Sequence, residues 1–574
     1  MVLPDIKNLK YLLEERTRMT DSSKSLKTTL RVLVAAIIMT GTFIIPPMPA
    51  AHAADGDLDN TMTGWKWQNG TRIQPTSAKT DGAYDVMVDA AGTWTVGGFW
   101  SNRNDSHTHH SWFIRQYGVV GGAPNAFSGS TNSRLFWSPG QDHQKKTLAM
   151  ADGRYAMVGY TGTSTTAIRD YDCVIAVRQA DGDLDTTGFN SSGSKPATVV
   201  MSTANAKGRM WVAFSNANND KCYDGAIAPD GKIVVCGYMD TPSNGKNMAL
   251  ARVTTTGELD TTFTDDGKVM SHWNGDDICR AVKVQADGKV VIAGTTNDQD
   301  ASGDAFVARY NADGTIDTSF STDGMHVFDA GESARDLAKD LEIQSDGKIV
   351  VGGIIEGTKS WIARLNADGT MDTSFGGGDG IITTQLTAND NFEALAIASD
   401  GKILAGGWTN TVSNWKSDFL LAKFTTAGAI DTSFGGGDGF SAVDLGAHND
   451  MISAGNDDRA YGMAISPVTG SVMLAGQSQI SGNNKEFSMA IFLNSTGPAA
   501  GYTVSETART VSEAGTTQTF TVVLDSQPTG DVVFDVSASD TGEATVSAST
   551  LTFTNGNWNT PQTVTVTGID DSLD

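Results

Sequence analysis

Cysteine and proline are scarce in this sequence, with only four cysteines and 14 prolines among 574 residues. The cysteines, at positions 173, 222, 236 and 279, are too few and too scattered for a disulfide framework or a Cys-x-x-Cys metal site. A cross-strand disulfide between Cys222 and Cys236 is one option. The favoured interpretation is that Cys222 and Cys279, each eight residues before the Asp of an Asp-Gly pair, are small buried residues.

Positive charge is also in short supply. The chain has 41 Lys and Arg against 66 Asp and Glu, a formal net charge of −25. This excess of negative charge argues against nucleic acid and anionic membranes as partners, and it suits a protein that meets divalent cations. Sixty-three glycines, together with many Thr, Val, Ser and Asp, favour short strands joined by tight turns.

Long apolar runs are absent apart from residues 30–45, which follow Lys24 and Lys27 and precede an Ala-x-Ala pattern ending at Ala53. This order predicts a signal peptide, with Met19 as the true start. The run is shorter than the roughly 20 residues that span a bilayer, so we expect an extracytoplasmic protein, secreted or at the cell surface, with no membrane span after cleavage. Without residues 1–53 the net charge becomes −28.

The rest of the chain is organised around a repeated string. Residues 311–320 read Asn-Ala-Asp-Gly-Thr-Ile-Asp-Thr-Ser-Phe, and close or looser copies occur at 180–189, 256–263, 366–375 and 427–434. A second element, Asp-Gly-Lys followed by a short apolar strand, occurs at 230–237, 287–294, 346–353 and 400–407, with weaker copies at 91–98, 152–154 and 469–476. The two elements together indicate seven units.

The clearest unit predicts four antiparallel strands at 278–285, 290–293, 305–310 and 325–328. Four strands in about 55 to 60 residues are typical of a beta-propeller blade, and too bulky for one rung of a solenoid. The string at 55–59 matches 181–185 and could complete the last unit, which lacks its own copy. We therefore predict an all-β chain with a closed seven-bladed propeller over residues 54–498.

The combination of Asp-Gly-Lys-Ile-Val-Val, Ala-Arg-Leu-Asn-Ala-Asp-Gly-Thr and Asp-Thr-Ser-Phe-Gly-Gly-Gly-Asp-Gly resembles the delta-60 repeat family of bacterial exported proteins. The resemblance is close over residues 230–440. It implies a propeller and an exported location, and it brings no catalytic residues to transfer.

From about residue 499 the composition changes to Thr, Val and Ser, and predicted strands at 511–515, 519–524, 532–536, 549–553 and 562–569 suggest a β-sandwich module over 499–574. The module is similar to Calx-beta domains, although their usual Ala-Gly-x-Asp-Tyr strand is missing, and it could be incomplete at Asp574. That resemblance places calcium-binding carboxylates at Glu513, Asp540, Asp570 and Asp571. Ca²⁺ is therefore the one cofactor that the resemblance suggests, although the sequence shows no complete ligand set.

Other polar motifs favour structural roles. The Asp strings at 55–59 and 181–185 lack a full calcium loop, and the Gly-Gly-Gly-Asp-Gly copies after Phe375 and Phe434 are not in tandem, so turns are expected. His107, His109 and His110 beside Asp105 are a weak metal signal in a polar loop.

No nucleophile elbow, zinc-protease or phosphate-loop motif occurs. The preferred hypothesis is an exported, non-enzymatic binding or adhesion scaffold for a protein or polysaccharide. The alternative is a hydrolase or lyase acting on polysaccharide at the propeller centre. Four tryptophans could then stack on sugars: Trp273, Trp361, Trp408 and Trp415. In either case, function is expected where the repeat copies differ.

Overall fold

The computed structural model describes most of the repeat region and of the C-terminal segment. The described residues are 33–35, 41–44, 81–89, 92–102, 109–117, 142–162, 171–195, 206–214, 219–242, 245–273, 275–298, 303–331, 334–357, 359–387, 389–410, 417–445, 457–481, 484–492, 494, 502–505, 508–512, 514–524, 528, 531–538, 542–554 and 556–570. Every named element among them is a strand. The chain divides into two compact units, one being Ala53–Gly497 and the other Met1–His52 with Pro498–Asp574.

The larger unit contains seven antiparallel sheets, which we name blades 1 to 7 in chain order. Blade 1 is β3 (Asp81–Val88), β4 (Trp94–Asn102) and β5 (His109–Tyr117); blade 2 is β6 (Asp142–Ala149), β7 (Tyr155–Gly162), β8 (Tyr171–Arg178) and β9 (Arg209–Val212); blade 3 is β10 (Asp220–Ile227), β11 (Ile233–Thr241), β12 (Gly245–Val253) and β13 (Lys268–Ser271).

Blade 4 is β14 (Ile278–Val284), β15 (Val290–Thr295), β16 (Ala305–Tyr310) and β17 (Met325–Phe328); blade 5 is β18 (Asp336–Ile343), β19 (Ile349–Ile355), β20 (Lys359–Leu365) and β21 (Ile381–Thr384); blade 6 is β22 (Asn389–Ile397), β23 (Ile403–Asn410), β24 (Ser417–Phe424) and β25 (Phe440–Val443); blade 7 is β26 (Asp458–Ile465), β27 (Val472–Ser481) and β28 (Asn484–Phe492). The bounds of blade 4 agree closely with the predicted strands, and the seven sheets are consistent with the predicted count.

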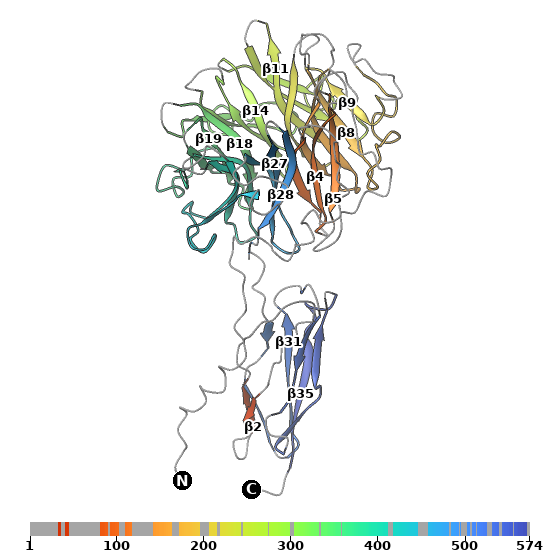
Figure 1. The fold of residues 1–574 in the computed structure, drawn as a ribbon, viewed down its shortest axis with the longest axis vertical. Coiled ribbons are helices and arrows are strands. Elements are labelled where there is room, and N and C mark those ends of the chain that lie inside the picture. Colours follow the sequence, from red (N-terminus) through yellow and green to blue (C-terminus); the bar gives the residue numbers. More distant parts are fainter. Residues whose placement is uncertain are drawn as a thin grey trace. The chain divides into compact units, whose positions relative to one another are not determined.

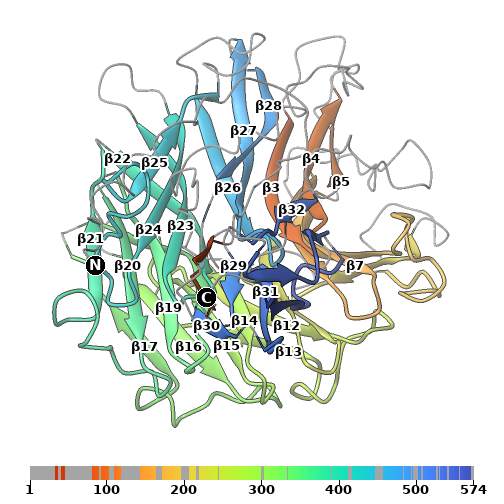
Figure 2. The same ribbon diagram turned by 90° about the horizontal axis from the view of Figure 1, so that it is seen from below.

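The first strand of each blade lies next to the first strand of the following blade, and β26 lies next to β3. The seven sheets therefore form a closed ring with their first strands innermost, and Figure 2 shows the strands radiating around a common centre. The strand that residues 55–59 were predicted to add lies outside the described residues. Within the described residues, blade 7 packs directly on blade 1, since Met473 and Ala475 share a core cluster with Ala83 and Val96.

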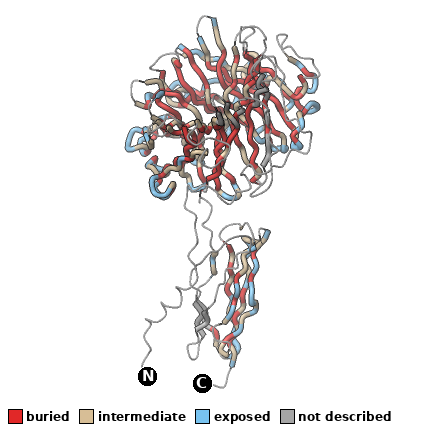
Figure 3. The backbone as a smooth tube through the Cα atoms, in the orientation of Figure 1, coloured by how far each residue is buried: buried red, intermediate tan, exposed pale blue. Residues whose placement is uncertain are grey.

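The hydrophobic core lies between neighbouring blades. The middle strand β19 of blade 5 is buried along its whole length, because both faces of its sheet are covered by other blades. One apolar cluster joins Val291 and Val307 of blade 4 to Leu341 and Val351 of blade 5. In Figure 3 the buried segments accordingly run through the blades, and the exposed ones mark turns.

The repeated string around residues 311–320 forms a turn and a connector, as predicted. Asp313 accepts a hydrogen bond from the Thr315 backbone N–H at 3.0 Å, and Gly314 adopts φ of +85°, a conformation that glycine adopts without steric cost. Asp317 then accepts bonds from the backbone N–H and the hydroxyl of Ser319, at 3.1 and 2.6 Å. Phe320 is fully buried. The string is therefore structural, and its Asp317 is not a ligand for an external partner.

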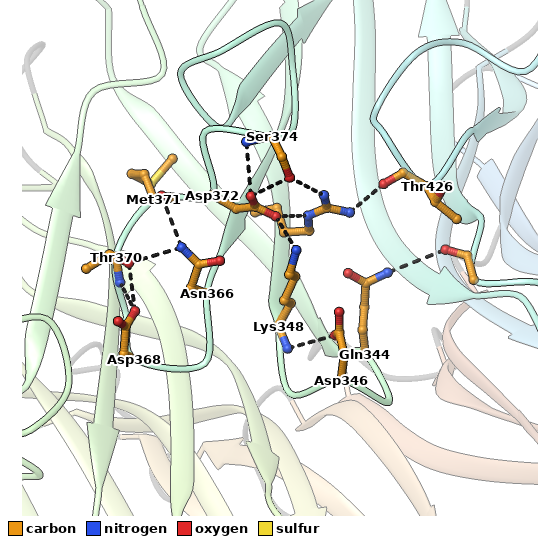
Figure 4. A network of polar contacts seen from close by, with 12 residues as sticks. Gln344, Asp346, Lys348, Asn366, Asp368, Thr370, Met371, Asp372, Ser374 and Thr426 are labelled. Carbon is orange, nitrogen blue, oxygen red and sulfur yellow. Dashed lines mark hydrogen bonds and ion pairs between the residues drawn. The ribbon is translucent and has the colours of Figure 1, made fainter.

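The structure explains why the two repeat elements occur together. The Lys of Asp-Gly-Lys, Lys289, reaches the Asp317 carboxylate at 2.8 Å, and Arg309 reaches the same oxygen at 2.7 Å. Burial alone would raise the pKa of Asp317, but hydrogen bonds from Lys289, Ser319 and Arg309 hold it well below its ordinary range. Figure 4 shows the equivalent network in blade 5, with Asp372 between Lys348 and Ser374.

Each connector also contacts the next copy of itself. Gly369 of the following copy lies against the ring of Phe320, so closely that a β-carbon at position 369 would stand 2.8 Å from the ring. The backbone N–H of Ser321 donates to the carbonyl of Asp368 at 2.7 Å, and Arg309 donates to the carbonyl of Ala367 at 2.6 Å. The connectors therefore form a chain of blade-to-blade contacts.

Both disulfides join neighbouring blades, which corrects the sequence interpretation. Cys173 of β8 bonds Cys222 of β10, and Cys236 of β11 bonds Cys279 of β14. Cys222 and Cys279 do occupy one repeat position, and both are fully buried, but they are not free. The predicted pairing of Cys222 with Cys236 across one hairpin was wrong, because Cys222 bonds Cys173 of the preceding blade.

The segment after residue 498 forms strands around a core of its own (Figure 1). Strands β29 (Tyr502–Val504), β31 (Thr517–Leu524), β33 (Ala544–Val546) and β35 (Gln562–Gly568) form one sheet, and β32 (Val532–Asp535) pairs with β34 (Thr550–Phe553). Strand β30 (Ala508–Val511) pairs with β2 (Gly41–Ile44), which pairs with β1 (Leu33–Ala35). The predicted strand at 511–515 was wrong, because Gly515 turns there with φ of +73°.

The cleavage at Ala53 and the Calx-beta likeness stay predictions. In the part of the chain that the structure describes, no helix has the length and apolar character needed to cross a bilayer.

Substituting Asp317 by Ala should cost roughly 3 to 5 kcal/mol in the free energy of unfolding, because it leaves the buried Arg309 guanidinium without its carboxylate. Denaturant unfolding measures this loss. Asp313→Ala removes an exposed turn carboxylate of the same string and is the matched control, with a much smaller effect expected. Equal effects of the two substitutions would contradict the assigned roles.

Peptide mapping without reduction should recover the Cys173–Cys222 and Cys236–Cys279 pairs. Because the linked residues are 49 and 43 positions apart, reducing either bond should lower the free energy of unfolding by roughly 4 kcal/mol. The double variant Cys173→Ala, Cys222→Ala isolates the second bond. Recovery of a Cys222–Cys236 peptide would refute the assignment.

Candidate functional site

Every blade carries a β-bulge at the same place in its innermost strand. The pairing of first and second strands shifts by one residue in all seven blades. A bulge leaves one residue unpaired and redirects its side chain. The residues at the seven bulges are Tyr84, Lys145, Tyr223, Arg280, Lys339, Glu393 and Tyr461, which we name the bulge ring.

All seven residues of the bulge ring are partly exposed, although the strands that carry them surround the centre of the propeller. They also differ from blade to blade, with three tyrosines, two lysines, one arginine and one glutamate. The repeat thus holds the backbone of this position constant while it varies the side chain. These are the properties expected of a site built from residues where the copies differ.

Contacts between members of the bulge ring connect neighbouring blades. Tyr461 and Tyr84 lie with their ring centroids 5.2 Å apart, and the Lys145 ammonium lies 3.7 Å from the centroid of Tyr84. Lys339 contacts both carboxylate oxygens of Glu393, at 3.0 and 3.1 Å. A cation over an aromatic face is attracted by the ring electrons, so these contacts orient the side chains before any ligand arrives.

The electrostatics of Lys145 show that the charges of the ring act on one another. Enclosure by protein lowers the pKa of Lys145 to about 7; the carboxylate of Glu393 opposes this, and the positive charges of Lys221, Lys339 and Arg280 add to it. These groups come from blades 3, 4, 5 and 6, so they converge on blade 2 across the centre. Lys145 consequently exchanges its proton near neutral pH.

A second layer of charged residues follows directly after the bulges and holds the blades together. Asp85 accepts a hydrogen bond from the backbone N–H of Thr147 in the next blade at 2.7 Å and pairs with Lys146 at 3.3 Å. Asp224 accepts likewise from Val282 at 2.8 Å, and burial raises its pKa to about 6. These carboxylates act as structural links beneath the bulge ring.

An aromatic group extends the site in blades 2 and 3. His143, Tyr160, Tyr171 and Tyr238 lie within ring-contact distance of one another or of Tyr223, for example His143 and Tyr160 at 5.0 Å. The Lys221 ammonium lies 4.1 Å from the ring of Tyr171 and 4.7 Å from that of Tyr160. Aromatic rings and cationic side chains therefore lie side by side where blades 2 and 3 face the propeller centre.

Two of the tryptophans proposed to bind sugars lie elsewhere. Trp361 is fully buried and packs edge-on against Phe328, so it is a core residue. Trp273 is partly buried and packs on Phe306. Trp408 occupies in blade 6 the second-strand position of Tyr160 and Tyr238, and it is partly exposed with the Arg459 guanidinium 4.5 Å from its ring. Trp415 lies outside the described residues.

The structure agrees with turn roles for the repeated carboxylates, where it describes them. Asp181 and Asp379 each accept a hydrogen bond from the backbone N–H two residues later, at 3.0 Å. Asp570 of the proposed calcium set is exposed. Several other predicted ligands lie outside the residues whose side chains are described: Glu513, Asp540, Asp571, Asp105, His107, His109 and His110.

An open surface pocket of about 660 Å³ is lined by residues that include Asp152, Arg154, Asp185 and Thr256. Arg154 and Asp185 form an ion pair there at 2.8 Å, and they are the blade 2 equivalents of Lys289 and Asp317. The pocket is thus lined by the blade 2 copy of a structural network that other blades also contain. Its residue types recur from blade to blade, whereas those of the bulge ring differ.

Comparison with known proteins supports the architecture. Four stretches, residues 228–263, 285–320, 344–375 and 398–434, match the family model described as "Domain of unknown function (DUF5122) beta-propeller". The repeat is a beta-propeller repeat. No curated protein matches the chain.

Solved structures give only distant matches. One is the beta-propeller domain of the Trilobed protease from Pyrococcus furiosus, with 12% identity, a TM-score of 0.31, and coverage of 75% of this chain and 94% of that one. Another is a subtype N10 neuraminidase-like protein of A/little yellow-shouldered bat/Guatemala, with 10% identity, a TM-score of 0.34, and coverage of 72% and 94%. The propeller assignment therefore rests on the family model and the seven sheets.

Sequence reasoning missed the bulge ring, although a signal was present. In blades 2 to 6 the bulged residue stands seven positions before the Asp of the Asp-Gly turn, as Arg280 does before Asp287. Aligning the copies on that turn would have revealed a column of four charged residues and one tyrosine.

Lys145 should titrate near pH 7, well below the usual lysine pKa of about 10.4. Competitive acetylation of the full chain between pH 6 and 10, followed by peptide mass spectrometry, gives the midpoint for each lysine. Glu393→Gln should move the Lys145 midpoint lower still, because a carboxylate that favours the charged amine is lost. A Lys145 midpoint near those of the other lysines would contradict the described enclosure.

Proposed function

We propose that this chain is an exported, non-enzymatic binding scaffold whose ligand site is the bulge ring at the centre of the propeller. The observation that carries the proposal is the bulge found in all seven blades, which presents seven partly exposed, non-repeating side chains at one place. Repeat folds bind through such variable positions, because the repeated residues are occupied with holding the fold.

Charge and side-chain type favour an acidic polysaccharide as the ligand. Four cations, Lys145, Lys221, Arg280 and Lys339, converge at the centre of a protein whose formal net charge is −25. Arg and Lys recognise carboxylates through charge-assisted hydrogen bonds, and tyrosines supply flat apolar faces with a polar end. A sugar residue that bears a carboxylate fits both kinds of side chain. A protein segment with acidic residues is the other ligand class that the sequence suggests.

Export is part of the proposal. Two inter-blade disulfides favour an oxidising compartment, and the leader pattern before Ala53 agrees with secretion or display at the cell surface. The C-terminal module, with its Calx-beta likeness, would then serve as a stalk or adhesive unit, and the delta-60 likeness points to the same setting.

One observation favours a second candidate, a polysaccharide lyase. Lys145 has a pKa of about 7 and its ammonium lies 3.7 Å from the Tyr84 ring, so a neutral amine is available at physiological pH as a general base. In the reaction Lys145 would take the proton from the carbon next to a uronate carboxylate, with Arg280 neutralising that carboxylate. The bond from the adjacent carbon to the glycosidic oxygen would then break, a C=C double bond would form, and the leaving sugar oxygen would take a proton from water. Such an enzyme would release unsaturated oligosaccharides.

Binding to a glycan array that contains uronate and neutral polysaccharides tests the proposal. We expect the full chain to bind uronate polymers, and Lys145→Ala with Arg280→Ala to weaken binding at least tenfold. The matched control is Lys207→Ala, just before the outermost strand of blade 2, which should leave binding unchanged.

Absorbance of unsaturated products separates binding from lyase activity. Retention of uronate without product formation supports the scaffold, whereas turnover supports the lyase. Absence of glycan binding, or binding that survives both substitutions, would overturn the assignment of the bulge ring.

A further inference from the structure

A buried aspartate stands at the start of the first strand in blades 2 to 7. It is the first residue of that strand in blades 2, 3, 5 and 7, the residue directly before β14 in blade 4 and the second residue of β22 in blade 6. These residues are at most 2% exposed: Asp142, Asp220, Asp277, Asp336, Asp390 and Asp458. One oxygen of this carboxylate links the blades. Asp336 Oδ2 accepts the N–H of Ala330 at 2.7 Å, and Asp458 Oδ2 accepts that of Leu445 at 2.8 Å, in each case from the segment that follows the fourth strand of the preceding blade.

The second oxygen has different surroundings in different blades. In blades 2, 4 and 6 it accepts a hydrogen bond from a threonine hydroxyl near the end of the second strand or directly after it, for example Thr296 to Asp277 at 2.7 Å. In blade 5 the paired residue is Ile355, which has no hydroxyl, and in blade 7 it is Ser478, whose hydroxyl is not in bonding geometry. The Oδ1 atoms of Asp336 and Asp458 are therefore buried without a hydrogen-bond partner.

Further carboxylates gather at these same two junctions. Asp418 of β24 and Asp444, which follows β25, each place a carboxylate oxygen within 4.8 Å of one another and of Asp458. Asp304 and Asp329 occupy the equivalent places beside Asp336, since Asp304 precedes β16 and Asp329 follows β17. Asp304, Asp329 and Asp336 are thus the repeat equivalents between blades 4 and 5, but among the described residues only the group between blades 6 and 7 brings three carboxylate oxygens this close together.

Three carboxylates this close together repel one another when all are ionised. The carboxylate oxygens of Asp418, Asp444 and Asp458 lie within 4.8 Å of one another, and a cation among them would remove this repulsion.

The repeat itself shows a cation at this place. At the junction between blades 5 and 6, Lys359 stands where Asp418 and Asp304 stand in the other two, and Gln385 stands where they have Asp444 and Asp329. That junction thus carries one lysine and one carboxylate, that of Asp390. No ion pair joins Asp418 or Asp458 to a lysine or arginine among the described residues.

We propose that Asp418, Asp444 and Asp458 bind a divalent metal ion at the junction between blades 6 and 7. Because all three ligands are carboxylates, with no histidine or cysteine, the expected ion is Ca²⁺, which prefers oxygen donors. The ion would join two neighbouring blades. The disulfides join blades 2, 3 and 4, so the metal site would strengthen a junction that has no covalent link.

The inference is independent of the ligand at the bulge ring and of the calcium predicted near Asp570. Its test measures metal content and thermal stability of the full chain after chelation and return of Ca²⁺. Wild type should regain bound Ca²⁺ and melt several degrees higher. Asp418→Asn should bind one ion fewer than wild type, whereas Asp304→Asn, at the equivalent place between blades 4 and 5, should keep this ion, and Asp570→Asn should not alter the difference.

The matched variant is Asp418→Lys, which copies the arrangement of Lys359. It should fold, bind one ion fewer and show a smaller rise in melting temperature on addition of Ca²⁺ than wild type. It also provides the test should Asp418→Asn fail to fold. Wild-type chain that regains no Ca²⁺, or Asp418 variants that bind as many ions as wild type, would overturn the proposal.

Discussion

The ring depends on a buried carboxylate in the repeat connectors. In blades 3, 4 and 5 this carboxylate, of Asp260, Asp317 or Asp372, is held by an arginine from the third strand and a lysine from the turn between the first two strands. A buried charge of this kind is tolerated only with its partners in place, so the strands that supply them must meet in one geometry. The adjoining phenylalanine packs on the next copy, and the geometry of one blade therefore fixes the position of the next.

Because the repeated residues hold the fold, other positions can vary from blade to blade. The repeated residues hold turns, connectors and blade contacts, whereas the bulge in each innermost strand presents a side chain that no repeated contact requires. Tyr84, Lys145 and Arg280 illustrate how one backbone position carries aromatic and cationic side chains around a single centre. A constant frame with variable central residues is the arrangement expected of a binding propeller.

The sequence predicted the frame better than the junctions between its parts. The strands of blade 4 and the turn role of residues 311–320 followed from apolar periodicity and Asp-Gly turns, which are local signals. The predicted disulfide pairing was wrong because Cys222 bonds Cys173 of the preceding blade, a contact that depends on how the sheets pack. The aspartate cluster was missed for the same reason, since Asp418 and Asp458 come together only across a blade junction.

A crystal structure of the full chain with a uronate oligosaccharide tests the central claim most directly, that the non-repeating residues at the propeller centre form the binding site. The account predicts that the sugar carboxylate contacts Lys145 or Arg280 and that a sugar ring lies against Tyr84. A sugar that binds instead to the repeat connectors, against Asp317 or its equivalents in other blades, would contradict it.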